Sequence, residues 1–199
     1  MESIVLASGS LRRQEYFRLM GLPFNIMPSQ IEEDHDERGD PETVAGDLAV
    51  RKVKKAIKTL ENRLPLWICG ADTIISIDGK IYGKPRDRED AGNMLKTLQG
   101  REHRVVTAVA LYNGREKTID CRPVTSGVTF APLSEREIEW YLDTGEWQGA
   151  AGSYKMQGLA SCFISNIRGS YSAIVGLPMR EFYVMLVENG YPYGDATVS

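Results

Sequence analysis

The feature that most constrains the fold is the alternation of short apolar runs with segments of helical periodicity along the 199 residues. The first unit sets the pattern. Residues 4–7 form an apolar run that predicts a buried strand, and residues 11–20 take helical spacing, with Ser10 as a natural N-cap and Gly21 as a natural stop. Strands that alternate with helices in this way are typical of α/β folds, so we predict an α/β protein.

The same signals place the remaining elements. Further strands are predicted over residues 24–27, 104–111 and 163–167. A buried strand over residues 66–69 runs into residues 70–73, and residues 74–77 continue extended to a hairpin turn at Asp78 and Gly79. Helices are predicted from Asp40 onward, over residues 87–98, from the capping box at Ser134, and over residues 178–189. No linker or internal repeat interrupts the series, so we expect one compact unit over residues 1–199, with a cleft between two lobes.

The composition limits which functions and which kinds of site we expect. The chain has 24 Lys and Arg against 27 Asp and Glu, for a net charge of −3, which argues against a protein that coats nucleic acid. Two histidines and three cysteines are too few to favour a zinc site, and the cysteines form no C-x-x-C pair. The chain shows no signal peptide and no membrane-length apolar run, so we expect reduced thiols and a cytoplasmic protein with no membrane partner.

The segment Ser8-Gly9-Ser10-Leu11-Arg12-Arg13 combines features of a phosphate site at a strand-to-helix junction. A glycine allows a tight turn, two hydroxyls can donate or accept, and a helix N-terminus carries free N–H groups and partial positive charge. The two arginines add charge-assisted donors. An ordinary serine-capped helix with solvated arginines is the alternative that local sequence leaves open.

Two further segments bring charge to predicted strand ends and turns. Asp72, followed by Thr73, stands at the end of the predicted buried strand, where a carboxylate can hold Mg²⁺ or accept a proton from water. Lys84 precedes a proline after the hairpin, which suits a cation aimed at phosphate. The alternatives are a turn-forming aspartate and a solvated basic turn.

The last two segments are an acidic stretch and a glycine-rich loop. Glu32, Glu33 and Asp34 could supply a metal ligand or a base, although such runs are usually solvated loops. In the loop over residues 151–158, Gln157 could read a base edge and Tyr154 could stack. Together the five segments contain the parts needed for metal-assisted attack on a nucleotide phosphate.

In their order along the chain and in their residues, these segments resemble the motifs of the Maf family of nucleoside triphosphate pyrophosphatases. The matching blocks span nearly the whole chain and read LASGSLRRQE, IEE, LAVRK, GADT, GKP, AGSYKMQG and VGLP. The resemblance implies a two-lobed mixed α/β sheet with flanking helices and a central cleft, similar to the inosine triphosphatase fold. It also implies a homodimer in the cytoplasm that uses Mg²⁺ or Mn²⁺ to hydrolyse nucleoside triphosphates to the monophosphate and pyrophosphate.

The resemblance also assigns roles to individual residues. Asp72 corresponds to the proton acceptor, and Arg12, Thr73 and Gln157 fall at positions of substrate specificity. Glu33, Lys52 and Lys84 match polar positions for metal or phosphate. We therefore expect the metal at Glu33 and Asp72, catalysis by Asp72, Glu33 and Lys84, and substrate contacts from a larger set. That set is Ser8, Ser10, Arg12, Arg13, Lys52, Thr73 and Gln157.

Gln157 points to the branch that resembles dTTP/UTP pyrophosphatases, because the branch that prefers 7-methyl-GTP has Glu at that position. Two residues depart from the motifs expected for that branch. Leu11 replaces the proline of the usual Ser-Pro-Arg-Arg motif, and Lys155 is a feature of the 7-methyl-GTP branch. The alternatives are thus a 7-methyl-GTP pyrophosphatase or a non-catalytic nucleotide-binding regulator of cell division. The carboxylates Glu33 and Asp72 favour the enzyme, because a pure anion binder gains nothing from negative charge beside phosphate.

Overall fold

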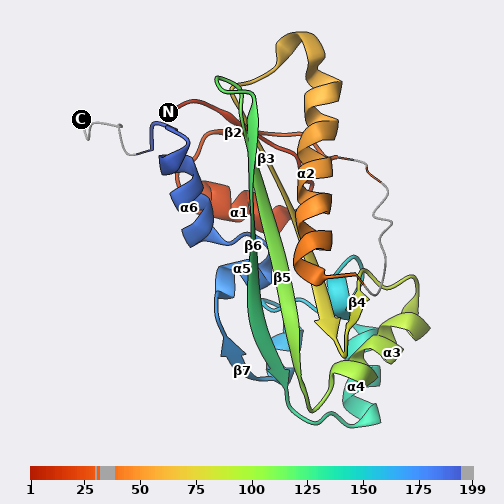
Figure 1. Ribbon diagram of the computed structural model, residues 1–199. Helices are drawn as coiled ribbons and strands as arrows, with labels where there is room; N and C mark the ends of the chain where they lie inside the picture. The colour runs from red at the N-terminus through yellow and green to blue at the C-terminus, as the bar shows by residue number, and fades with distance from the viewer. Residues whose placement is uncertain (30, 32–38, 194–199) are drawn as a thin grey trace.

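The computed structural model describes residues 1–29, 31 and 39–193. Its centre is an open seven-stranded sheet with the order β2-β1-β3-β5-β6-β7, and β4 pairs with β3 outside this path (Figure 1). The strands are β1 (Ile4–Leu6), β2 (Phe24–Ile26), β3 (Trp67–Ile77), β4 (Lys80–Tyr82), β5 (Glu102–Asn113), β6 (Thr118–Phe130) and β7 (Ile164–Arg168). β1 runs parallel to β2 and β3, and the other pairings are antiparallel, so the predicted mixed α/β sheet is confirmed.

Helices flank this sheet. They are α1 (Leu11–Leu19), α2 (Pro41–Leu60), α3 (Arg88–Leu98), α4 (Glu135–Asp143), α5 (Tyr171–Val175) and α6 (Met179–Glu188), with 3₁₀ turns η1 (Glu61–Arg63), η2 (Ala151–Ser153) and η3 (Leu159–Phe163). The predicted caps of α2 and α4 are confirmed: Asp40 accepts from the N–H of Thr43, and Ser134 and Glu137 form a capping box. Helix α5 was not predicted, because five residues are too few for a helical period to show.

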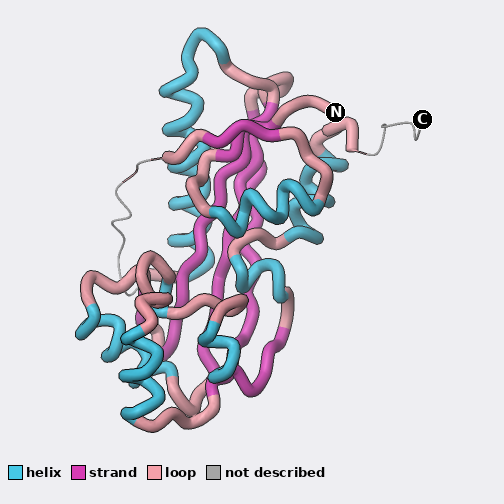
Figure 2. Tube along the Cα trace, turned by 180° about the vertical axis from the view of Figure 1, so that it is seen from behind, coloured by secondary structure: helices cyan, strands magenta, loops and turns pink. Residues whose placement is uncertain are grey.

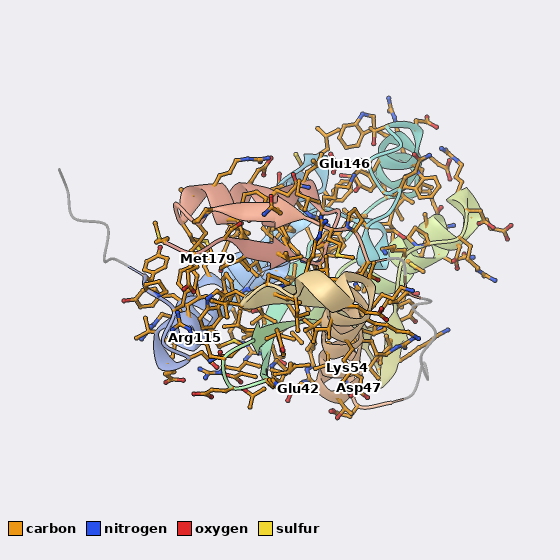
Figure 3. All side chains as sticks on the ribbon, turned by 90° about the horizontal axis from the view of Figure 1, so that it is seen from above. Glu42, Asp47, Lys54, Arg115, Glu146 and Met179 are labelled. Carbon is orange, nitrogen blue, oxygen red and sulfur yellow. The ribbon has the colours of Figure 1, made fainter. Side chains whose placement is uncertain are left out.

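The two faces of the sheet carry different helices (Figures 1 and 2). Strand residues alternate between faces, so Ile4 and Leu6 of β1 pack against α1 and α6, whereas Val5 packs against α2. The outer side of α2 is polar, and Asp47 and Lys54 are exposed there (Figure 3). No helix in the described part of the chain is long and apolar enough to span a membrane.

A third cluster of buried side chains lies toward the far end of β3 and β5. It joins Ile75 and Ile77 of β3 to α3 and α4, and it includes aromatic residues of the loop after α4. The sheet therefore continues through two lobes, one covered by α1, α2 and α6 and the other by α3, α4 and η2. The cleft described below lies between them, along one edge of β3.

Strand β3 loses its neighbour on one side near its middle. β1 pairs with β3 only as far as Cys69, and β4 pairs with it again only from Ile75. On the other side β5 pairs with β3 continuously from Trp67 to Ser76. Residues 70–74 consequently form an open stretch of strand edge that no described strand covers on that side.

Asp72 lies within this open stretch. The expectation that it ends a strand is wrong, because β3 continues for five residues beyond it as the antiparallel partner of β5. The apolar run 74–77 that follows Asp72 belongs to the same strand. Although it is only 6% exposed, Asp72 lines the cleft beside this open edge, and a break in β3 is not required.

Candidate active site

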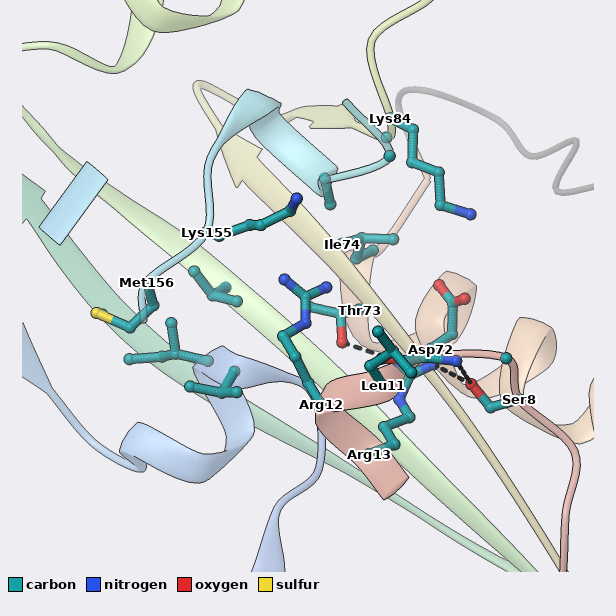
Figure 4. Close-up of a pocket in the computed structure, with 18 of the residues that line it drawn as sticks. Ser8, Leu11, Arg12, Arg13, Asp72, Thr73, Ile74, Lys84, Lys155 and Met156 are labelled. Carbon is teal, nitrogen blue, oxygen red and sulfur yellow. Dashed lines mark hydrogen bonds between the residues drawn. The ribbon is translucent and has the colours of Figure 1, made fainter. Parts of the chain in front are cut away.

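A cleft of about 800 Å³ opens along the uncovered edge of β3 (Figure 4). It is lined by the turn from β1 into α1, by the middle of β3, by the segment after β4 and by residues 148–157. Every predicted site residue that the structure describes lines it: Ser8, Ser10, Arg12, Arg13, Lys52, Asp72, Thr73, Lys84 and Gln157. The predicted ligand Glu33 lies outside the described residues. We call residues 8–13 the N-terminal wall and residues 148–157 the C-terminal wall.

Strand alternation sends the two polar residues of β3 to opposite faces. Asp72 faces α2, where the ammonium of Lys52 contacts its Oδ1. Both residues are 6% exposed. Lys52 also lies 3.5 Å from the carbonyl of Ala71. The pair is buried because Lys52 is on the side of α2 that faces the sheet.

Gly70 explains how α2 comes close enough to β3 for this pair to form. A Cβ at Gly70 would lie 2.7 Å from the carbonyl oxygen of Ala49 and 2.9 Å from a methyl carbon of Val53. Any side chain at this position would push the helix away from the strand. The glycine before Asp72 therefore has a packing role that places Lys52 on the carboxylate.

Thr73 faces the opposite side, toward α1, and meets Arg13. The guanidinium of Arg13 donates from Nε to the carbonyl of Gly176 at 2.7 Å, from Nη1 to Ser8 Oγ at 3.1 Å and from Nη2 to Thr73 Oγ1 at 3.2 Å. Thr73 Oγ1 is in turn 2.9 Å from Thr107 Oγ1 on β5. Arg13 is 9% exposed and joins the N-terminal wall to β3 and to the end of α5. Its prediction as a substrate ligand stays a prediction.

Arg12 differs from its neighbour because successive helical side chains point about 100° apart. It reaches into the cleft, as Figure 4 shows, and no hydrogen bond of its guanidinium is seen among the described residues. Partial burial lowers the pKa of Arg12, against the attraction of Tyr16 and Glu15. A cation that protein acceptors do not occupy suits an anionic ligand better than Arg13 does.

The serines of the N-terminal wall act differently from the expected cap. Ser10 stands at the N-cap position of α1, but its side chain makes no cap hydrogen bond. Its N–H instead donates to Ser8 Oγ at 3.3 Å, the same oxygen that accepts from Arg13. The N-terminal N–H groups of α1 thus have no side-chain cap, which leaves the first turn of this helix suited to an anion.

The C-terminal wall contains two consecutive residues with positive φ, Gly152 at 62° and Ser153 at 68°. The N–H of Gly152 donates to the carbonyl of Gly83 at 2.9 Å, which ties this wall to the segment of Lys84. A Cβ at position 152 would lie 2.4 Å from Cδ1 of Ile75. Ser153 is fully buried, and its hydroxyl lies 3.1 Å from the sulfur of Met94.

Tyr154 anchors the same wall from within the core. Its hydroxyl lies 2.7 Å from Nε2 of His103, and both rings pack edge-on against Phe130. Burial lowers the pKa of His103 to about 4 and raises the pKa of Tyr154. Nδ1 of His103 has no hydrogen-bond partner in the described structure. Sequence reasoning missed His103, because nothing local to it indicates a partner 51 residues away.

Lys84 and Gln157 complete the cleft from its more exposed side. Both side chains are exposed, Lys84 after β4 and Gln157 on the C-terminal wall. Figure 4 shows Lys84 on the side of the cleft away from Met156 and Lys155. The predicted residues therefore meet around one space, although they come from segments that are far apart in the sequence.

The donors available for a metal are few. Within residues 1–29, 31 and 39–193 there is no group of three or more His, Cys, Asp or Glu residues placed to hold an ion. Asp72 is the buried carboxylate that lines the cleft, with the hydroxyls of Ser8 and Thr73 also in the lining. Such a donor set fits Mg²⁺, which is commonly bound by one or two carboxylates together with substrate phosphates.

The fold and the cleft together define an α/β protein with a cation-rich cleft at a strand edge. A sequence model described as Maf-like protein matches residues 3–189. The chain belongs to the Maf family.

Similar proteins carry a common name. A protein of Symbiobacterium thermophilum is 40% identical over 96% of each chain, and one of Ruminiclostridium cellulolyticum is 43% identical over 94% of this chain and 95% of its own. One of Escherichia coli O157:H7 is 41% identical over 94% of this chain and 92% of its own. All three are named dTTP/UTP pyrophosphatase. The solved structure of the Staphylococcus aureus Ham1 protein aligns with 65% of this chain and 72% of its own, with a TM-score of 0.45 and 18% identity.

Proposed function

We propose that this protein hydrolyses dTTP and UTP to the nucleoside monophosphate and pyrophosphate. The observation that carries the proposal is the cleft, which joins a buried carboxylate, several cations and an exposed amide in a space large enough for a nucleotide. The relatives named dTTP/UTP pyrophosphatase support the same conclusion, since they match this chain over more than nine-tenths of its length. We further infer that residues 1–199 work as one unit, because both lobes contribute to the cleft.

Asp72 is the residue we assign to proton transfer. Asp72 lines the cleft, and the water that attacks the α-phosphorus would be oriented by its carboxylate and lose a proton to it. Lys52 holds the carboxylate in one orientation and offsets part of its charge beside the incoming phosphates. Removal of either partner would leave the other charge buried without a counter-ion.

The remaining polar residues of the cleft position the substrate. Arg12, Lys84 and the first turn of α1 supply positive charge for the phosphates and for the departing pyrophosphate. Ser8, Ser10 and Thr73 supply hydroxyls beside them. Arg13 keeps the N-terminal wall and β3 together, a positioning role that its three protein acceptors support.

A divalent cation fits this donor set. Mg²⁺ or Mn²⁺ would be held by Asp72 and by Glu33, together with phosphate oxygens, and would supply charge neutralisation at the phosphates. The preference for dTTP and UTP is assigned to Gln157, whose amide can pair with the carbonyl and N–H groups of uracil or thymine. A site that hydrogen-bonds one base edge penalises others, because their polar groups would be left unpaired.

The test is pyrophosphate release from dTTP, UTP, CTP and 7-methyl-GTP, each measured with Mg²⁺ and with Mn²⁺. We expect dTTP and UTP to be hydrolysed fastest and Asp72→Asn to lower turnover by about a hundredfold or more. Thermal melting of the variant shows whether it is folded at the assay temperature. Near-normal turnover by folded Asp72→Asn would refute the catalytic assignment, and no preference for dTTP or UTP would refute the substrate assignment.

A further inference from the structure

Lys155 lines the cleft, and the reaction proposed above gives its ammonium no role. It stands on the C-terminal wall between Tyr154 and Met156, which are 5% and 6% exposed. With both neighbours turned into the core, the lysine side chain is directed outward. Figure 4 shows it pointing into the cleft, and its residue is half-buried.

The backbone that carries Lys155 is held at several points. Its carbonyl accepts from the N–H of Gly158 at 3.0 Å, and its backbone is also hydrogen-bonded to the hydroxyl of Tyr141. The residue before it, Tyr154, is fixed by the 2.7 Å contact with His103. The ammonium is thus presented by a rigid wall, so a ligand would bind it at little cost in backbone entropy.

No counter-charge for this ammonium is found in the described structure. Cations on the outer surface, such as Arg88 and Lys96, pair with carboxylates of α4. Lys155 forms no such ion pair and no side-chain hydrogen bond with any residue in the described ranges. Glu15, an exposed carboxylate in the cleft lining, acts on Arg12. A partly desolvated cation without a partner is unfavourable, and an anionic ligand would relieve that cost.

We propose that Lys155 binds the triphosphate of the substrate and is a further substrate-binding residue of this cleft. The inference rests on the proposed nucleoside triphosphate function. Phosphate is the preferred partner over the base, because a pyrimidine edge is neutral and is matched by the amide of Gln157. Since Lys52 and Arg13 already bond to protein oxygens, Lys155 adds positive charge that those residues do not supply.

Binding measurements on the full chain with Mg²⁺ test this assignment. The probes are inorganic tripolyphosphate, the α,β-imido analogue of dUTP and deoxyuridine, each titrated by calorimetry. Lys155→Met removes the charge and keeps most of the apolar stem, and Lys155→Arg keeps the charge. Lys54→Met, on the outer side of α2, is the matched control because it removes an exposed lysine outside the cleft.

We expect Lys155→Met to weaken tripolyphosphate and the imido analogue by about tenfold, the effect of one charge-assisted contact. Lys155→Arg should restore most of this affinity, whereas deoxyuridine binding in all variants and all binding by Lys54→Met should match the unsubstituted protein. Lys155→Gln provides a second neutral variant should the methionine form melt early.

Two results would overturn the proposal. One is unchanged tripolyphosphate affinity in the neutral variants, with or without weaker binding of the imido analogue, since the lysine would then contact the nucleoside or nothing. The other is no tripolyphosphate binding by the unsubstituted protein. Tripolyphosphate has no base. Weaker tripolyphosphate binding by Lys155→Met would therefore support the proposal even if the protein showed no preference for dTTP and UTP.

Discussion

The two walls of the cleft are held in place by different interactions. The N-terminal wall depends on one buried arginine, whose guanidinium reaches Ser8, Thr73 and Gly176. The C-terminal wall depends on packing: the rings of Tyr154 and His103 pack edge-on against Phe130, and the turn at Gly152 fits against Ile75. Both arrangements fix cleft side chains before a ligand arrives, which lowers the cost of binding and of reaction.

The difference implies different sensitivities. A charge network fails when one donor is lost, because its acceptors lose a buried charge-assisted hydrogen bond. A packed wall fails when volume is added, or when a buried group must take up charge. Substitutions can therefore separate the two walls, and the expected effects decrease in the order given below.

The largest effect is expected from Arg13→Ala. It removes three buried charge-assisted hydrogen bonds that join three segments, so we expect the free energy of unfolding to fall by about 4 kcal/mol. Arg12→Ala is the matched control one residue away. It removes a guanidinium that makes no hydrogen bond in the described structure, so its cost should stay below about 1 kcal/mol. Denaturant unfolding measures both, and equal losses would contradict the distinction between the two arginines.

The second effect is a pH dependence of the C-terminal wall. Burial holds the pKa of His103 at about 4 in the folded protein, below its usual value of 6.5. Between these values the unfolded chain takes up a proton that the folded chain does not, so stability falls as the pH decreases from 6.5 to 4. The loss attributable to this residue is about 3 kcal/mol.

His103→Gln isolates that contribution. Denaturant unfolding at pH 7, 5.5 and 4.5 should show a shallower loss in the variant than in the unsubstituted protein. Parallel losses in the two proteins would mean that His103 is not the source of the pH dependence.

The smallest effect is expected from Gly152→Ala. A Cβ at position 152 would clash with Ile75, and the backbone φ of 62° is unfavourable for alanine. We therefore expect the free energy of unfolding to fall by about 2 kcal/mol. Gly145→Ala is the control, since its φ is 70° but no atom lies within 4 Å of the added carbon, so it should cost about 1 kcal/mol. Adding Ile75→Val to Gly152→Ala removes the Cδ1 contact. The cost of alanine at position 152 should then come closer to its cost at position 145. Identical costs at both glycines would argue that the fit against Ile75 is unimportant.

Local signals predicted much of this fold. The strand before α1, the cap at Asp40 and the capping box at Ser134 depend on residues within a few positions of each other, and all are confirmed. Asp72 was placed at the wrong point in its strand because the pairing of β3 with β5 beyond Asp72, and the early end of β1 beside it, are properties of the sheet. The sequence of β3 alone contains no sign of where its neighbour stops.

The candidate site shows the same limit. Motif order brought nine described residues to one cleft, yet it could not separate Arg12 from Arg13, because their difference depends on which way α1 faces. Lys52 was predicted as a substrate contact, and its pairing with Asp72 requires the close approach that Gly70 permits. His103 had no local signal, since its partner Tyr154 is distant in the chain.

The central claim is that water attacks the α-phosphorus of the substrate with Asp72 as proton acceptor. Hydrolysis of dTTP in water enriched in oxygen-18, followed by mass spectrometry of the products, tests it most directly. The account predicts that the label enters the phosphate of dTMP, that the pyrophosphate is unlabelled, and that Asp72→Asn slows its appearance by about a hundredfold or more. Label in pyrophosphate, release of dTDP with orthophosphate, or unchanged labelling by the folded variant would contradict it.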